Sequence, residues 1–153
     1  MANSSGLCYS FKTDLLQGLH AFGPAVVRAA TTADTFYGAL FLATGALAPA
    51  TTTAYSVTSE VPNSGTYVAG GQAITNATVP TQTTGTAYWT PSGSLSWTGF
   101  TGTAFDTLLV YNNTAAGKNA VGVFTFSTQT ITAGTFTLTM PTNNNTTGLV
   151  RLA

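Results

Sequence analysis

Few side chains in this sequence can gain, lose or hold a charge, and chemistry would have to occur at these residues. The single histidine, His20, has no cysteine or carboxylate pattern around it, so neither a tetrahedral metal site nor a hydrolytic triad can be built from it. We expect His20 on the surface or at a subunit contact. The single cysteine, Cys8, excludes an internal disulfide and is expected to be a packed side chain rather than a nucleophile.

The carboxylates offer another route to catalysis, because two facing carboxylates are enough for glycoside hydrolysis. They lie far apart in the sequence, at Asp14, Asp34, Glu60 and Asp106, so a pair would meet only through the tertiary fold. There is no Asp-x-Asp run for calcium and no glycine loop ending in Gly-Lys-Ser or Gly-Lys-Thr for phosphate. We expect no catalytic residue, no metal site and no cofactor. A secreted hydrolase that uses Asp106 or Glu60 is a distant alternative.

The composition is unusual in its scarcity of charge. Only 5% of the 153 residues are charged, against about 25% in a typical globular protein, and the formal net charge is zero. The four Lys and Arg residues are scattered, so no basic stripe can neutralise phosphates and nucleic-acid binding is not expected. A free monomer with so little charge lacks the repulsion that keeps soluble proteins apart. We infer a subunit packed in an assembly, or one exposed to harsh surroundings outside a cell.

Neither end of the sequence nor its interior carries a membrane signal. Residues 1–10 lack the basic start and the continuous apolar run of a secretory signal, and no stretch reaches the ~18 apolar residues of a membrane helix. We therefore expect synthesis and folding in a cytoplasm, without a membrane partner.

The stretch from Asn119 to Pro141 carries the strongest structural pattern. Apolar and hydroxyl side chains alternate in its two halves, which predicts two strands, and the break at 129–134 predicts a hairpin turn between them. Turn signals elsewhere bring the expected total to about seven to nine short strands. The expected fold is all-β: an antiparallel β-sandwich, Ig-like or jelly-roll-like, over residues 34–153, with a short N-terminal helix.

Residues 1–33 are expected to form a helical segment or arm. Ser10 is a suitable cap for a helix that ends at Phe22 before Gly23-Pro24, and the strand that follows, at 34–44, is apolar on both faces. This helix either packs on the end of the sheet or docks on a neighbouring subunit. The side chains predicted to make assembly contacts are Phe11, Leu15, Leu19, Phe22, Phe36 and Phe41.

Aromatic side chains gather near Pro91, at Tyr88, Trp89 and Trp97. Core packing is the favoured interpretation, but exposed aromatic rings can also stack on sugars. These three residues are therefore the candidate contacts for a glycan.

The order of these pieces resembles small structural proteins encoded by tailed bacteriophages. The resemblance rests on the N-terminal helix and apolar strand, then on Glu60-Val61, Gly65-Thr66-Tyr67, residues 69–75, the segment around Trp97, Phe105 to Tyr111, Val123 to Phe126, residues 134–138 and Leu149 to Leu152. It implies a non-enzymatic virion protein made in the host bacterial cytoplasm: a capsid decoration or cement protein that binds the major capsid protein and itself, as a homotrimer or other cyclic oligomer. The alternative is a head-fibre or tail adsorption module that binds host-surface glycans.

Overall fold

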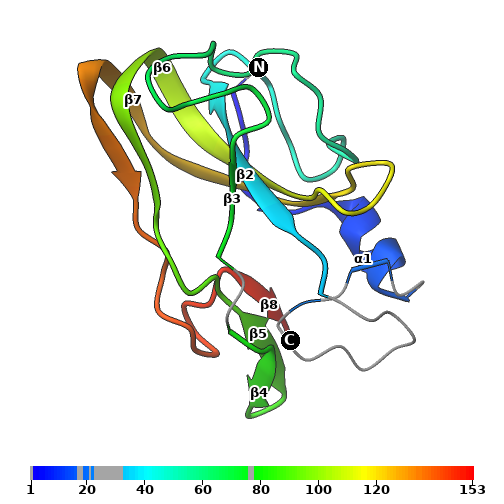
Figure 1. The fold of residues 1–153 in the computed structure, drawn as a ribbon. Coiled ribbons are helices and arrows are strands. Elements are labelled where there is room, and N and C mark those ends of the chain that lie inside the picture. The colour runs from blue at the N-terminus through cyan, green and yellow to red at the C-terminus, as the bar shows by residue number, and fades with distance from the viewer. Residues whose placement is uncertain (1, 17–18, 21, 23–32, 76–77) are drawn as a thin grey trace.

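Two antiparallel β-sheets pack together into an all-β sandwich, as predicted (Figure 1). The structure is a computed structural model that describes every residue except 1, 17–18, 21, 23–32 and 76–77. One sheet has the strand order β1-β7-β6-β2-β3 and the other has the order β4-β5-β8. The elements are β1 (Gly6–Leu7), α1 (Tyr9–Leu16), β2 (Phe36–Leu42), β3 (Gln72–Ala73), β4 (Thr81–Thr83), β5 (Thr86–Trp89), β6 (Leu95–Asn112), β7 (Ala120–Leu138) and β8 (Val150–Leu152).

The long ribbon of β6 and β7 dominates the larger sheet and corrects the predicted hairpin. Residues 129–134 form no turn, because β7 continues through them and pairs Gln129 with Phe105 and Ile131 with Gly102. The polar break is absorbed by four register shifts between Trp97 and Thr107, which curl the ribbon (Figure 1). The turn that joins the two strands lies at 113–119 instead.

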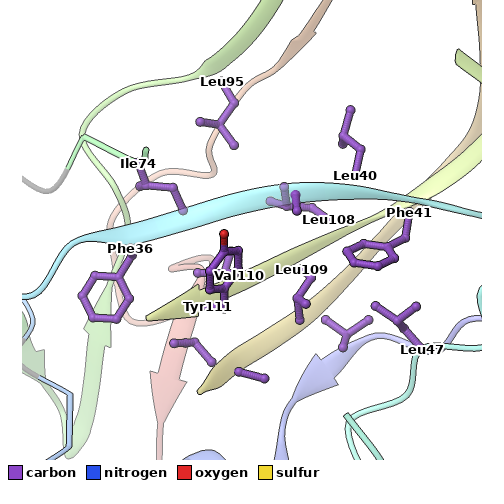
Figure 2. Close-up of a cluster of buried hydrophobic side chains, with 14 of the residues drawn as sticks. Phe36, Leu40, Phe41, Leu47, Ile74, Leu95, Leu108, Leu109, Val110 and Tyr111 are labelled. Atoms are coloured by element: carbon purple, nitrogen blue, oxygen red, sulfur yellow. The ribbon is translucent and has the colours of Figure 1, made fainter. Parts of the chain in front are cut away.

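Strand β2 lies between β6 and the short edge strand β3 in the larger sheet, and it is covered on both faces, as its two apolar faces predicted. Gly38 leaves no room for a side chain, because a Cβ there would lie 2.6 Å from Leu95 Cδ1. Phe36 and Phe41 are 0% and 1% exposed. Figure 2 shows Leu40, Ile74 and Leu95 on one side of β2, and Phe41, Leu47 and Leu109 on the other.

Residues 59–71 close the outer edge of β2. Their backbone pairs with this edge through the Val61 N–H to Leu40 O bond and the Leu42 N–H to Ser59 O bond. The chain then turns at Gly71, which has φ +74° and lies so close to the Gly38 carbonyl that a Cβ would meet its oxygen at 2.0 Å. After this turn, Gln72–Ala73 forms the short strand β3, and residues 76–77 lie outside the described residues.

The N-terminal segment is built into the same core. Strand β1 pairs with β7, and the Asn3 side chain bonds Asp106 while accepting the Leu47 N–H. Helix α1 begins at Tyr9, one residue before the predicted cap Ser10, and it places Phe11 in the core with no exposed surface. The helix ends at Leu16, so the prediction that it reaches Phe22 is wrong: Leu19, His20 and Phe22 are not helical, and Gly23-Pro24 lies outside the described residues.

Candidate functional site

An apolar pocket of about 160 Å³ lies between helix α1 and the small sheet. It brings together residues that the sequence had suggested for two different functions: Phe11, Leu15 and Phe22 from the predicted assembly set, and Tyr88 and Trp89 from the predicted glycan set. The remaining lining residues are Pro80, Ala87, Val150 and Leu152. No single segment of the sequence contains this juxtaposition, because the fold creates it.

The rings of Phe22 and Trp89 pack edge to face in one wall of this pocket, and Phe36 stacks on Phe22. The Phe22 ring lies 4.9 Å from the Trp89 ring and 4.6 Å from the Phe36 ring, measured between centroids. The indole of Trp89 donates to the Thr78 carbonyl oxygen at 3.3 Å. Apolar side chains line the pocket, which therefore fits an apolar side chain better than a polyhydroxylated sugar.

The other predicted site residues divide by exposure. Trp89 and Trp97 are 2% and 1% exposed, so neither ring face is open to a sugar in this conformation. Trp97 packs against Tyr67 and stacks on Phe136. Leu19, at 39% exposed, is the member of the assembly set that offers the most surface, whereas Phe11, Phe36 and Phe41 lie in the chain's own core.

The surface position predicted for His20 is wrong. Its side chain is 7% exposed and its ring lies 5.0 Å from that of Phe11, because the packing of the N-terminal segment on the sheet encloses it. The Asn112 amide nitrogen lies 3.2 Å from His20 Nδ1 and 2.8 Å from Asp34 Oδ2. The Asn112 side-chain oxygen Oδ1 accepts hydrogen bonds from the N–H groups of Thr114 and Ala115. The cluster therefore fixes the β6–β7 turn against the N-terminal segment.

Glu60 is the centre of a buried polar cluster, and its side chain is 7% exposed. Its Oε1 accepts from the Tyr67 hydroxyl at 2.7 Å and from the Gly70 N–H at 2.7 Å, and its Oε2 accepts from the Tyr55 hydroxyl at 2.6 Å. The Tyr111 hydroxyl closes the cluster by donating to the Gly70 carbonyl oxygen at 2.8 Å. Three donors thus hold this carboxylate in place of water.

The tyrosines around Glu60 are held in their neutral form. Burial, followed by the hydrogen bond and negative charge of Glu60, raises the pKa of Tyr55 and Tyr67 well above the usual value. Burial and the Glu60 charge raise the pKa of Tyr111 to about 12. The Lys118 ammonium lies 5.2 Å from the centre of the Tyr55 ring, where it contributes a cation–π contact.

The other groups considered for catalysis also have structural partners. Asp106 Oδ1 accepts from the Asn3 amide at 2.7 Å and from the Thr107 hydroxyl at 2.6 Å. Cys8 has no exposed surface, and burial raises the pKa of its thiol to about 11. Within the described part of the chain, no group of three or more His, Cys, Asp or Glu side chains is placed to hold a metal ion. None of the described helices is long and apolar enough to cross a membrane.

Known families, curated proteins and solved structures give no match to this chain. Its function must be argued from its own surface and contacts.

Sequence reasoning missed the outer edge of β7. Strand β1 covers this edge only at Gly122 and Val123, and the Ser5 hydroxyl extends the cover to the Thr125 N–H. From Phe126 to Leu138, no described segment pairs with it. The sequence did indicate a long strand here, as an uncharged, proline-free run of strand-forming residues. The turn predicted at 129–134 led us to read this run as two shorter strands.

Proposed function

We propose that this chain is a non-enzymatic structural subunit of a tailed-phage virion, most simply a capsid decoration or cement protein bound to the major capsid protein on the head. The observation that carries the proposal is the nature of the surface. Among the side chains that the structure describes, Lys118 and Arg151 are the exposed charges, and hydroxyl and amide groups make up most of the other exposed polar positions. Such a surface suits extensive packing against neighbours better than life as a free monomer.

The hydrogen bonds of the buried carboxylates support a structural role over a catalytic one. Asp34 and Glu60 are 8% and 7% exposed, and each accepts hydrogen bonds from the chain's own framework. Asp106 holds the N-terminal segment through Asn3. These carboxylates stabilise the fold, and the phage resemblance supplies the expected setting.

We place the contact with the capsid protein at the apolar pocket between α1 and the small sheet. Leu152 lines this pocket and is 37% exposed, and Val79, next to the lining residue Pro80, is 49% exposed. An apolar side chain of the capsid protein would fill the pocket and cover this rim. The glycan-binding alternative has less support, because its two tryptophans are buried.

The test uses purified heads of the encoding phage that lack this protein, to which the full-length chain is added back. We expect many symmetry-related copies by cryo-electron microscopy and at least a tenfold loss of affinity with Leu152→Asp. Val57→Asp is the matched control, since Val57 is 62% exposed and does not line the pocket. Absence of binding, or equal binding by both variants, would contradict the proposal. Deleting residues 1–22 is expected to abolish binding too, but it removes β1 and Phe11 and is therefore a blunter test.

A further inference from the structure

The outer edge of β7, residues 126–138, has no pairing partner among the described segments. An unpaired edge presents a row of backbone N–H and C=O groups that another strand can bond. Figure 1 shows this half of β7, in orange, along the outside of the molecule. At ~3.3 Å per residue, a 13-residue edge is up to ~40 Å long.

This edge also lacks most of the usual protection against pairing. Strand β7 contains no charged residue and no proline over its 19 residues. Natural edge strands commonly carry a lysine, a proline or an inward-pointing charge to prevent association. The one protective feature of this edge is a pair of β-bulges in β7, at 131–134 and at 125–129. A partner strand must therefore accommodate these bulges in its own register.

The positions of the bulges favour a second β7 as that partner. Strand β6 pairs with the inner side of β7 and has bulges of its own. Each places one additional β6 residue opposite a two-residue step of β7, at 134–136 and at 129–131. Strand β7 carries its own at 131–134 and at 125–129. A twofold rotation about Ile131 brings the bulges of a second β7 opposite 128–131 and 133–137. On the outer side of β7, the bulges of a second copy therefore lie opposite nearly the same residues as the bulges of β6 do on the inner side.

The side chains share this symmetry. Phe126 and Phe136 each lie five residues from Ile131, and all three are partly buried apolar residues packed against the core. An antiparallel pair centred on Ile131 brings the segment around each Phe126 beside the segment around the partner's Phe136. It also places the exposed Ser127 opposite Thr135, a hydroxyl pair that suits a cross-strand contact.

We propose that two copies of this chain associate by antiparallel pairing of the outer edges of β7, with the twofold axis beside Ile131. The pairing joins the two five-stranded sheets into one continuous sheet. It is the smallest cyclic oligomer, and the same patch serves both subunits.

This inference deepens the proposed assembly role, on which it rests, by naming one partner as the chain itself. The two can fail separately, because pairing is measured on the purified chain without capsids. A chain that dimerises but does not bind heads would refute the proposed capsid role alone. A monomeric chain that binds heads would refute the proposed β7 pairing alone.

The first experiment measures the mass of the full-length chain by sedimentation velocity, alone and with charges placed on the edge. We expect the wild-type chain to be a dimer. The variants Ser127→Lys/Thr135→Lys and Ser127→Glu/Thr135→Glu should each be monomeric, since like charges then face each other across the axis. An equimolar mixture of the two variants should recover the dimer mass.

The matched control places lysines at Ser96 and Thr103, which are exposed positions on β6. With strands spaced ~4.8 Å apart, these charges lie about 14 Å from the partner's, beyond the screening length of ~10 Å at moderate salt, so the dimer should persist. A second measurement uses Ile131→Cys, which should form an intersubunit disulfide because it faces its own copy; Cys8 is buried and stays unreactive.

A monomeric wild-type chain at ~100 µM, equivalent to a Kd well above the micromolar range, would overturn the proposal. So would a dimer that the edge lysines leave unchanged, or two monomeric charge variants whose mixture stays monomeric. Failure of Ile131→Cys to crosslink in a dimer would refute the axis position.

Discussion

Replacing Tyr67 by phenylalanine tests whether the Glu60 cluster holds the fold together. The substitution removes one hydroxyl and leaves the ring, which has no exposed surface, in place. That hydroxyl donates to Glu60 Oε1 at 2.7 Å and accepts the Leu40 N–H at 2.9 Å. Tyr67→Phe therefore breaks a hydrogen bond to a charged group and leaves a buried backbone donor unsatisfied.

The two losses have separate magnitudes. A hydrogen bond to a charged group contributes about 1.5–3 kcal/mol, and an unsatisfied buried donor costs about 1–3 kcal/mol. We expect Tyr67→Phe to lower the free energy of unfolding by about 3–5 kcal/mol, a large share of the ~5–15 kcal/mol typical of a domain. Tyr55→Phe is the matched control, because the Tyr55 hydroxyl also donates to Glu60 but its half-buried position admits water. Its loss should be about 1 kcal/mol.

The free energy of unfolding of both variants is measured by urea titration with tryptophan fluorescence as the signal, since the Trp97 ring lies 5.5 Å from the Tyr67 ring. An unchanged m-value would show that the denatured state is comparable in all three proteins. A double-mutant cycle with Glu60→Gln should give a coupling energy of at least ~1 kcal/mol with Tyr67→Phe. A Tyr67→Phe loss below ~1 kcal/mol, or equal losses for the two tyrosines, would refute the reasoning.

Three further predictions follow from the same packing. The raised pKa values of Tyr67 and Tyr111 (the latter about 12) mean that the unfolded chain loses these protons first as the pH rises. The free energy of unfolding, measured with urea, should therefore fall above pH ~10 by up to ~1.4 kcal/mol per pH unit for each tyrosine; a flat profile to pH ~11.5 would contradict this. Gly71→Ala should cost about 3 kcal/mol by thermal unfolding, because its φ is +74° and a Cβ would meet the Gly38 oxygen. The Cys8 thiol should react with a thiol reagent only at the rate of unfolding; fast labelling of the native chain would show that the thiol is accessible.

Strand β2 could be predicted from the sequence because its signal is local. Its two apolar faces indicate a central strand, and both faces are covered. The polar break at 129–134 misled the hairpin prediction because a turn and a bulge use similar residues. The deciding interaction is pairing with β6, where Ala133 adopts φ +46° without reversing the chain. Local alternation cannot distinguish these two outcomes.

The candidate site was predicted in its members but not in its arrangement. Phe11 and Leu15 were recognisable from helical spacing and Trp89 from its aromatic neighbours, whereas Phe22 lies beyond the end of the helix. Their meeting at one pocket depends on long-range packing. The Glu60 cluster shows the same limit. Tyr55 and Tyr67 flank Glu60 in the sequence at unequal distances, and only the closure of residues 59–71 against β2 aims both hydroxyls at one carboxylate.

The scarcity of charge and the open β7 edge are each costly for a free chain, but pairing across a twofold axis would resolve both. An uncharged edge that bonded to a different surface of its neighbour would leave a new edge exposed and could propagate into a fibre. In a twofold pair the two β7 edges bond to each other, so no open β7 edge remains and assembly through this edge stops at the dimer. The edge strands left on the joined sheet would then be the β1 and β3 strands of the two copies, each only two residues long. Short edge strands offer little backbone for further pairing, so a closed dimer would remain soluble without the charges that a monomer would need.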